Sequence, residues 1–226
     1  MTQAKLVDMN QAIAPRLVTE VPGPRARAHV EYDRRLSSPS LPRVYPFVPV
    51  RGRGAEVEDI DGNVFVDFCA GIAVNSTGHS HPAVIAAIKD QADDLVHYSA
   101  SDFYPPIYAQ MCESIAGTVP ISGAKRVYLG NSGAEVVEAS LKLARVHTGR
   151  PAVVSYLGGF HGRTMGAVTR TASKAKDHAG LSPLVNGIYP APYGHERDLA
   201  WFDEVLFDKI MPADEVAAII VEPVQG

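Results

Sequence analysis

The sequence predicts an α/β fold built around a mostly parallel sheet. From residue 125 onward, short apolar segments alternate with segments whose apolar residues recur every three to four positions, as strands alternate with helices. The run AAIIV at 217–221 is continuously apolar, as expected for a strand buried inside a parallel sheet. Hydrophobic residues make up 46% of the 226 residues, so the chain can bury a sizeable core.

Charge and cysteine content exclude several classes of protein. The formal net charge is −4, which leaves no basic surplus for a nucleic-acid backbone, and the ordinary composition argues against disorder. The two cysteines, Cys69 and Cys112, lie far apart, which argues against a disulfide framework and a structural zinc site. The first ten residues have no signal-like apolar stretch, and no apolar run could span a bilayer. We expect a cytoplasmic protein without nucleic-acid or membrane partners.

The first half of the chain shows a hairpin signal and two helix signals. Prolines recur through the first 50 residues and interrupt any periodic pattern. Asp61 and Gly62 separate two alternating segments, which is typical of a β-hairpin. Pro82 suits the first turn of a helix whose apolar stripe continues to Leu95. In order, we predict an irregular arm over 1–48, a hairpin over 53–68, and helices over 82–95 and 106–118.

The second half alternates between strand and helix patterns. Its clearest helix begins at Gly133, carries apolar residues such as Leu141 along one face, and has Gly149 as its expected end. The remaining elements follow from shorter apolar runs between turn residues. We predict strands over 125–129, 152–155 and 216–221, and helices over 133–147, 164–171 and 199–210.

The segment GNSGAE at 130–135 can bind an anion. It follows a predicted strand and opens the helix at Gly133, where the first N–H groups have no partner within the helix. The helix dipole adds partial positive charge there, so the segment suits a phosphate. The alternative is that Asn131 or Ser132 serves only as an N-cap.

Two further segments follow predicted strands. GGFHGRT at 158–164 brings an aromatic ring, an imidazole and a guanidinium into one turn, which suits an aromatic ligand and a carboxylate. The alternative is a tight turn with a packed Phe160 and a surface Arg163. VEPVQG at 221–226 places Glu222 at a strand end, where loops of α/β sheets form ligand crevices. An ordinary polar strand end is the alternative.

The segment GIAVNSTGHSHP at 71–82 contains His79 and His81. A His-x-His pair can ligate a metal, but no carboxylate lies close to it in the sequence. We therefore interpret both histidines as structural and expect no metal.

Four segments, in this order, resemble the class III (ω-amino acid) pyridoxal-phosphate aminotransferases: AGIAVNSTGHSHP, GNSGAEVVEASLKLAR, GGFHGRT and IIVEPVQG. The similarity runs from about residue 51 to Gly226, with a weaker match at 22–24, and the members most like this chain include the 4-aminobutyrate and acetylornithine/ornithine transaminases. It implies a fold-type I homodimer with helices on both faces of the sheet. It also implies pyridoxal 5'-phosphate as cofactor and ping-pong transfer, through a Schiff base, from an ω-amino acid such as 4-aminobutyrate to 2-oxoglutarate.

The resemblance also implies roles for individual residues. The phosphate, the cofactor ring and the substrate carboxylate each have a matching position, and the position that is Tyr in ornithine enzymes is Ile here, as in the 4-aminobutyrate type. The implied cofactor-binding residues are Ser132, Gly133 and Ala134 for the phosphate, Phe160 and His161 for the ring, and Glu222 nearby; the substrate-binding residues are Ile72 and Arg163.

The resemblance places the Schiff-base lysine, the aspartate that pairs with the pyridine nitrogen, and the small domain beyond Gly226. None of the seven lysines matches a Schiff-base motif, so we expect no catalytic residue within this chain. We predict an N-terminal arm over 1–50 and a partial, truncated large domain over 51–226. An exposed sheet edge should leave the isolated chain poorly stable and inactive.

Two other functions stay open. One is a non-catalytic, truncated or split-gene product that acts as a partner for another chain. The other is a racemase or aminomutase of the same fold, which keeps the cofactor chemistry without net transfer to 2-oxoglutarate. The coding sequence after Gly226 separates the first from an enzyme, and assays on the full-length protein separate the second.

Overall fold

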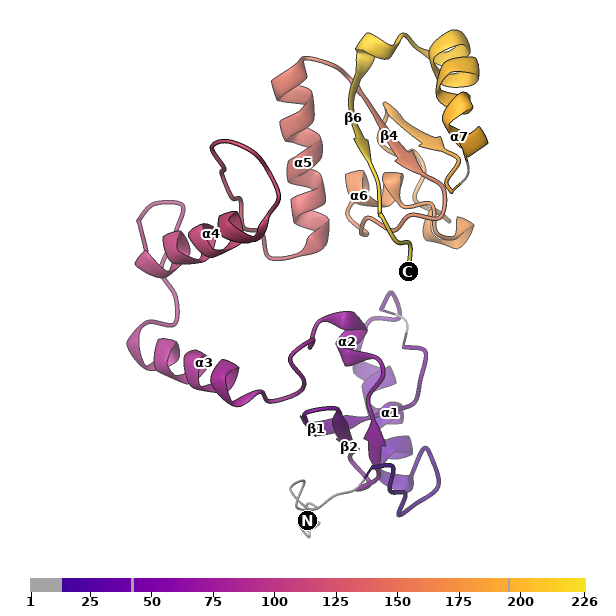
Figure 1. Cartoon of the computed structure of the whole chain (residues 1–226). Coiled ribbons are helices and arrows are strands. Elements are labelled where there is room, and N and C mark those ends of the chain that lie inside the picture. Colours follow the sequence, from indigo (N-terminus) through magenta and orange to yellow (C-terminus); the bar gives the residue numbers. More distant parts are fainter. Residues whose placement is uncertain (1–13, 42, 195) are drawn as a thin grey trace. The chain divides into compact units, whose positions relative to one another are not determined.

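The chain forms two compact units, Met1–Ser99 and Ala100–Gly226 (Figure 1). This computed structural model describes residues 14–41, 43–194 and 196–226. Within these residues, no helix combines the length and the apolar character needed to cross a membrane. The predicted division near residue 50, into an arm and part of a large domain, stays a prediction.

The first unit contains an antiparallel sheet in the order β1-β2-β3. The predicted hairpin is confirmed, because β2 (Glu56–Asp59) and β3 (Val64–Val66) pair antiparallel across the Asp61-Gly62 turn. A further strand, β1 (Pro49–Arg53), pairs with the other edge of β2.

The prediction of an irregular arm is wrong over α1 (Pro24–Leu36), which is a regular helix. Its N-terminal amides are capped by a distant side chain: Asp61 accepts from Arg25 N at 2.9 Å and from Ala26 N at 2.8 Å. Gly23 makes this possible, since a Cβ there would lie 2.4 Å from Asp61 Cγ. The arm before residue 14 lies outside the described residues.

Two further helical segments end the first unit. The predicted helix from Pro82 is confirmed as α3 (Pro82–Asp94). Before it lies α2 (Ala70–Ala73), a single turn whose four residues all have positive φ, between 48° and 66°. It is therefore a left-handed turn, which is rare for residues other than glycine.

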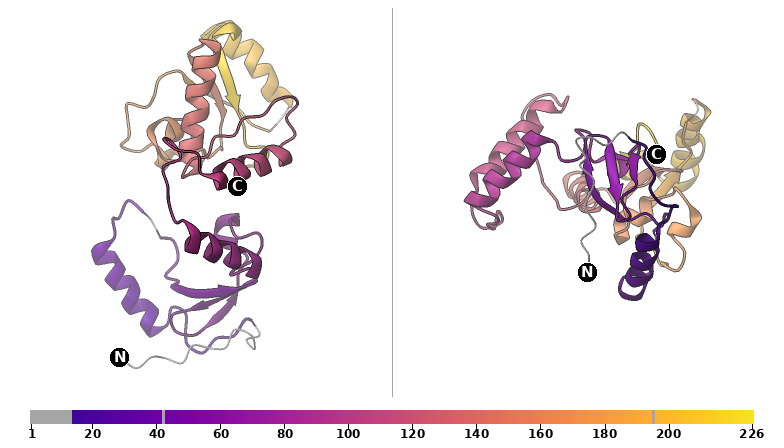
Figure 2. Two further views of the ribbon diagram at one scale, coloured as in Figure 1. Left: turned by 90° about the vertical axis from the view of Figure 1, so that its left-hand side faces the viewer. Right: turned by 90° about the horizontal axis from the view of Figure 1, so that it is seen from below.

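The second unit is organised around a parallel sheet in the order β5-β4-β6 (Figures 1 and 2). Strand β4 (Ala152–Tyr156) pairs in parallel with β5 (Ile188–Ala191) on one side and with β6 (Val216–Ile220) on the other. The predicted parallel α/β arrangement is confirmed, as are the strands predicted at 152–155 and 216–221.

Helical segments pack on the sheet of the second unit. The predicted helices 133–147 and 164–171 are confirmed as α5 (Gly133–Thr148) and α6 (Met165–Arg170), and Gly149 ends α5 in the left-handed conformation. On one sheet face, Ala152 and Val154 pack against Phe202 and Leu206. The helix predicted over 199–210 is instead a short α-helix, α7 (Glu196–Trp201), followed by a π-helix, η2 (Phe202–Ile210).

The second unit also contains α4 (Pro106–Thr118), the segment 125–129 and two short 3₁₀ turns. The helix predicted over 106–118 is confirmed as α4. The strand predicted over 125–129 is wrong: Lys125 Nζ donates to the Ala116 and Val119 carbonyls, each at 2.8 Å, so the segment closes the end of α4 instead of joining a sheet. Two short 3₁₀ turns, η1 (Ala175–Asp177) and η3 (Ala213–Glu215), lie within the connections.

Candidate active site

The loops that follow the three parallel strands converge on one another. Parallel strands end at the same edge of a sheet, so residues after β4 and β6 are brought together. The Phe160 amide, after β4, donates to Glu222 Oε2, after β6, at 2.9 Å. From the loop after β5, Tyr193 Oη donates to the Glu222 carbonyl at 3.0 Å.

The N-terminus of α5 leaves two amides free for a ligand. Ser132 is the N-cap, and its Oγ accepts from Glu135 N at 3.2 Å, as the capping alternative expected. This bond satisfies one orphan donor, and the next amide in the helix bonds to the Ser132 carbonyl. In the part of the chain that the structure describes, the N–H groups of Gly133 and Ala134 find no acceptor. Capping and anion binding therefore coexist at this helix end.

Gly162 brings the loop after β4, residues 158–164, against the N-terminus of α5. It has φ +125°, and a Cβ built there would lie 2.8 Å from Ala134 Cβ and 3.0 Å from Ala167 Cβ. A side chain at this position would force the loop away from α5. The contact encloses an open hollow of about 640 Å³, which is lined by Ser132, Gly133, Ala134, Val137, Phe160, His161, Gly162, Arg163 and Thr164.

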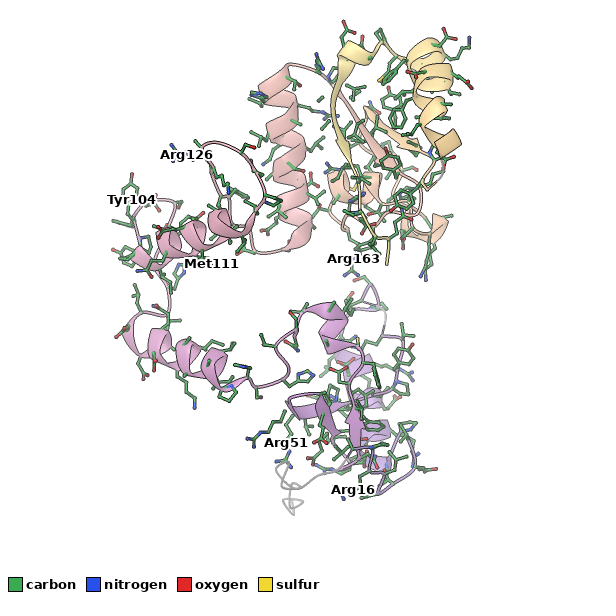
Figure 3. The ribbon with its side chains drawn as sticks, viewed as in Figure 1. Arg16, Arg51, Tyr104, Met111, Arg126 and Arg163 are labelled. Atoms are coloured by element: carbon green, nitrogen blue, oxygen red, sulfur yellow. The ribbon has the colours of Figure 1, made fainter. Side chains whose placement is uncertain are left out.

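The hollow fits a phosphate group. The free amides of Gly133 and Ala134 lie at the positive end of the α5 dipole, and both residues line the hollow. A Cβ built on Gly133 would meet no atom within 4 Å, so a ligand can approach the backbone there. The guanidinium of Arg163 adds a cation suited to a carboxylate, and Figure 3 shows its exposed side chain projecting outward from the second unit.

His161 is the buried member of the loop. It is 8% exposed, and its backbone N–H donates to Thr171 Oγ1 at 2.9 Å. Burial lowers the pKa of the His161 imidazole below 6.5; the Glu222 carboxylate opposes this and the Arg170 charge adds to it. The imidazole is therefore neutral at physiological pH, where it can accept or donate a hydrogen bond.

Glu138 lies beside the candidate site and was not predicted from the sequence. On α5, it accepts hydrogen bonds from the first turn of α6, directly after Arg163. Its position one helical turn after Ala134 was the available signal, because residues i and i+4 share a helix face.

Ile72 lies in the first unit, on the left-handed turn α2, and the residue is 86% exposed. Asp67 holds the start of this turn, because Oδ1 accepts from Cys69 N and Ala70 N at 2.7 and 3.0 Å. The role of Ile72 toward a substrate stays a prediction.

His79 is engaged within the fold. Its Nε2 lies 2.6 Å from Asp67 Oδ2, and its backbone pairs with Gly54. The hydrogen bond from His79, followed by those from two backbone amides and the charge of His79, lowers the pKa of Asp67 in spite of partial desolvation. Across residues 14–41, 43–194 and 196–226, no three His, Cys, Asp or Glu side chains are grouped as a metal would need.

Comparison with known proteins places the chain within one family. The family model for class-III aminotransferases matches residues 39–226. An alanine/serine racemase from Pyrococcus horikoshii is 32% identical over 94% of this chain and 48% of its own length. A 4-aminobutyrate aminotransferase from Mycobacterium tuberculosis is 35% identical over 93% of this chain and 50% of its own.

Solved structures point to the same family. The ornithine aminotransferase of Toxoplasma gondii, described with partial occupancy of PLP at its active site, is 30% identical, with a TM-score of 0.75 over 94% of this chain and 47% of its own. The chain thus spans about half the length of the relatives it matches.

Proposed function

The chain belongs to the class-III aminotransferases, and from this premise we propose that its protein transfers the amino group of an ω-amino acid, of the 4-aminobutyrate kind, to 2-oxoglutarate. The family uses pyridoxal phosphate. In the proposal, residues 1–226 supply the phosphate-binding and carboxylate-binding part of the active site.

One observation supports the proposal most directly. Gly162 packs on Ala134, so the free amides of α5 and the loop that presents Phe160 and Arg163 share one hollow. A phosphate and a substrate carboxylate need distinct donors close together, and the amides and the guanidinium supply them.

Each site residue has a proposed task. Ser132, Gly133 and Ala134 hold the phosphate, and Phe160 lies against the cofactor ring. Its amide is fixed by Glu222, whose charge faces the neutral His161. Arg163 binds the α-carboxylate of 2-oxoglutarate, and Ile72 contributes to the pocket for the amino donor. When bound, pyridoxal phosphate supplies the electron sink for the reaction, while these residues bind and orient.

The proposal includes the setting of the enzyme. We propose a cytoplasmic homodimer whose partners are small amino acids and oxo acids. The lysine that carries the cofactor is proposed to lie outside residues 1–226, so that this chain alone has no activity.

The test uses the full-length protein. We expect 4-aminobutyrate and 2-oxoglutarate to give glutamate, and the phosphorus NMR signal of pyridoxal phosphate to shift on binding. Failure of the full-length protein to bind pyridoxal phosphate would overturn the proposal. Binding without any glutamate from 4-aminobutyrate, ornithine or branched-chain donors would overturn the transaminase assignment alone.

A racemase is the second candidate. It is favoured by the alanine/serine racemase, which aligns with 94% of this chain. An assay with a single enantiomer of alanine or serine separates the two: a racemase inverts that enantiomer without consuming 2-oxoglutarate, whereas a transaminase forms glutamate from 2-oxoglutarate.

A further inference from the structure

The first turn of α6 is held by a carboxylate from α5. Thr164 is the N-cap residue of α6, yet it makes no capping bond to its own helix. Glu138 Oε1 instead accepts from Thr164 Oγ1 at 2.6 Å, from Gly166 N at 2.8 Å and from Ala167 N at 3.1 Å. One carboxylate oxygen therefore satisfies two of the amides, those of Gly166 and Ala167, that the first turn of the short helix leaves unpaired.

Gly166 has no side chain, which leaves room for the carboxylate of Glu138. A Cβ built on Gly166 would lie 2.3 Å from Glu138 Oε2, so a larger residue there would displace the carboxylate. Glu138 also follows Ala134 by one helical turn, and Ala134 is the residue on which Gly162 packs. The same face of α5 thus contacts the loop before α6 and the first turn of α6.

Arg170 fastens the other end of α6. It is 1% exposed; its Nη2 donates to the Val137 carbonyl at 3.1 Å, and its Nε to the Gly166 carbonyl at 3.1 Å. Burial acts to raise the pKa of Glu138, but the three hydrogen bonds and the charge of Arg170 outweigh it, and the net pKa is lowered. The carboxylate stays ionised at neutral pH, the state in which it accepts these bonds.

We propose that Glu138 is a positioning residue: by capping α6 from α5, it holds the loop 160–164 against the phosphate-binding helix end and keeps Arg163 in place to bind a substrate carboxylate. The proposal rests on the proposed function for the role of Arg163. Glu138 does not line the hollow, so it acts through the loop and not on a ligand.

The test uses three variants and one control variant of the full-length protein. Glu138→Ala removes the acceptor, whereas Gly166→Ala leaves the carboxylate intact but displaces it. Glu138→Gln keeps one acceptor oxygen without the charge and is the conservative variant. Glu113→Ala, on the exposed surface of α4, is the matched control.

The expected result is a split between two ligands. In Glu138→Ala and Gly166→Ala, KM for 2-oxoglutarate rises about tenfold because Arg163 is misplaced, while the affinity for pyridoxal phosphate changes less than about threefold. Amide hydrogen exchange at residues 166 and 167 becomes about tenfold faster, because the amides lose their acceptor. Glu138→Gln lies between these variants and the wild type, and Glu113→Ala matches the wild type.

Two results would overturn the positioning role. One is unchanged hydrogen exchange at residues 166 and 167 in Glu138→Ala and Gly166→Ala. The other is an equal loss of affinity for both ligands, which indicates general loosening of the fold. The proposed function fails separately, if the unaltered protein shows no transamination; hydrogen exchange still decides the capping contact in that case.

Discussion

The helices α5 and α6 both begin beside the same hollow, but their first turns are satisfied in different ways. At α5 the cap is local: Ser132 Oγ binds Glu135 N, and the amides of Gly133 and Ala134 stay free. At α6 the cap comes from Glu138, which takes both the Gly166 and the Ala167 amide. One helix end thus keeps two amides free for an anion, whereas at the other a carboxylate of the protein already occupies two amides. The difference teaches that an anion site depends on what the cap leaves unpaired.

A substitution that moves the loop containing Gly162 away from the N-terminus of α5 should have the largest effect on stability and binding. Gly162→Ala puts a Cβ 2.8 Å from Ala134 Cβ on a backbone with φ +125°. We expect about 3 kcal/mol lower stability, from strain and overpacking together, and loss of phosphate binding. Urea unfolding and phosphate titration measure both. Gly180→Ala, with φ +78° and open space, is the control for strain alone and should cost about 1 kcal/mol.

The loop before α6, which carries Arg163, should affect the binding of a substrate carboxylate and not the binding of phosphate. Arg163→Ala removes a forked, charged donor, so KM for 2-oxoglutarate should rise roughly thirtyfold, about 2 kcal/mol. Steady-state kinetics measure this change. The exposed Arg126→Ala variant is the control, and an unchanged KM in Arg163→Ala would show that Arg163 is misassigned.

One of the two free amides at the N-terminus of α5 can be removed without disrupting the helix. Gly133→Pro removes one free amide, and the extended Ser132 backbone, with φ −151° and ψ 160°, accepts a following proline. We expect phosphate affinity to fall about tenfold, the loss of one hydrogen bond to a charged group, with little change in melting temperature. Gly133→Ala keeps the N–H and should bind as the wild type does; equal weakening in both variants would contradict the amide mechanism.

The smallest effect should come from pH. Folding lowers the pKa of His161 below 6.5, so as the pH falls through 6.5 the unfolded state takes up a proton before the folded state does. Stability should therefore fall on acidification, by at most about 1.4 kcal/mol per pH unit. His161→Asn should flatten this slope in urea unfolding between pH 7.5 and 5.5. Identical slopes would show that the loop does not bury the imidazole.

Elements with local signals could be predicted from the sequence. Helix α5 has its cap, apolar stripe and glycine end within its own residues, so its bounds were close. Helix α1 was missed because its cap, Asp61, lies 35 residues after Ala26 and becomes its neighbour only in the fold. Strand β5 was missed because Pro190 lies inside it, and proline ordinarily argues against a strand.

The site shows the same division between local and distant causes. The loops GNSGAE and GGFHGRT could be predicted, since each follows a strand or opens a helix. The contact of Gly162 with Ala134 and the cap from Glu138 could not, because both join residues more than 25 positions apart. The strand predicted at 125–129 failed for a related reason: Lys125 finds its acceptors at the end of a helix.

Pro190 has a consequence for how copies of this protein meet. The carbonyl of Gly187, just before β5, accepts from Val153 N, and that of Ala191 accepts from Leu157 N, just after β4. Successive residues of β5 alternate in direction, so the nitrogen of Pro190 faces the outer edge. That edge lacks one of the donors that a strand from a neighbouring molecule would need. A strand that paired with this edge would therefore lack one hydrogen bond, while β5 keeps its full register with β4 inside the molecule.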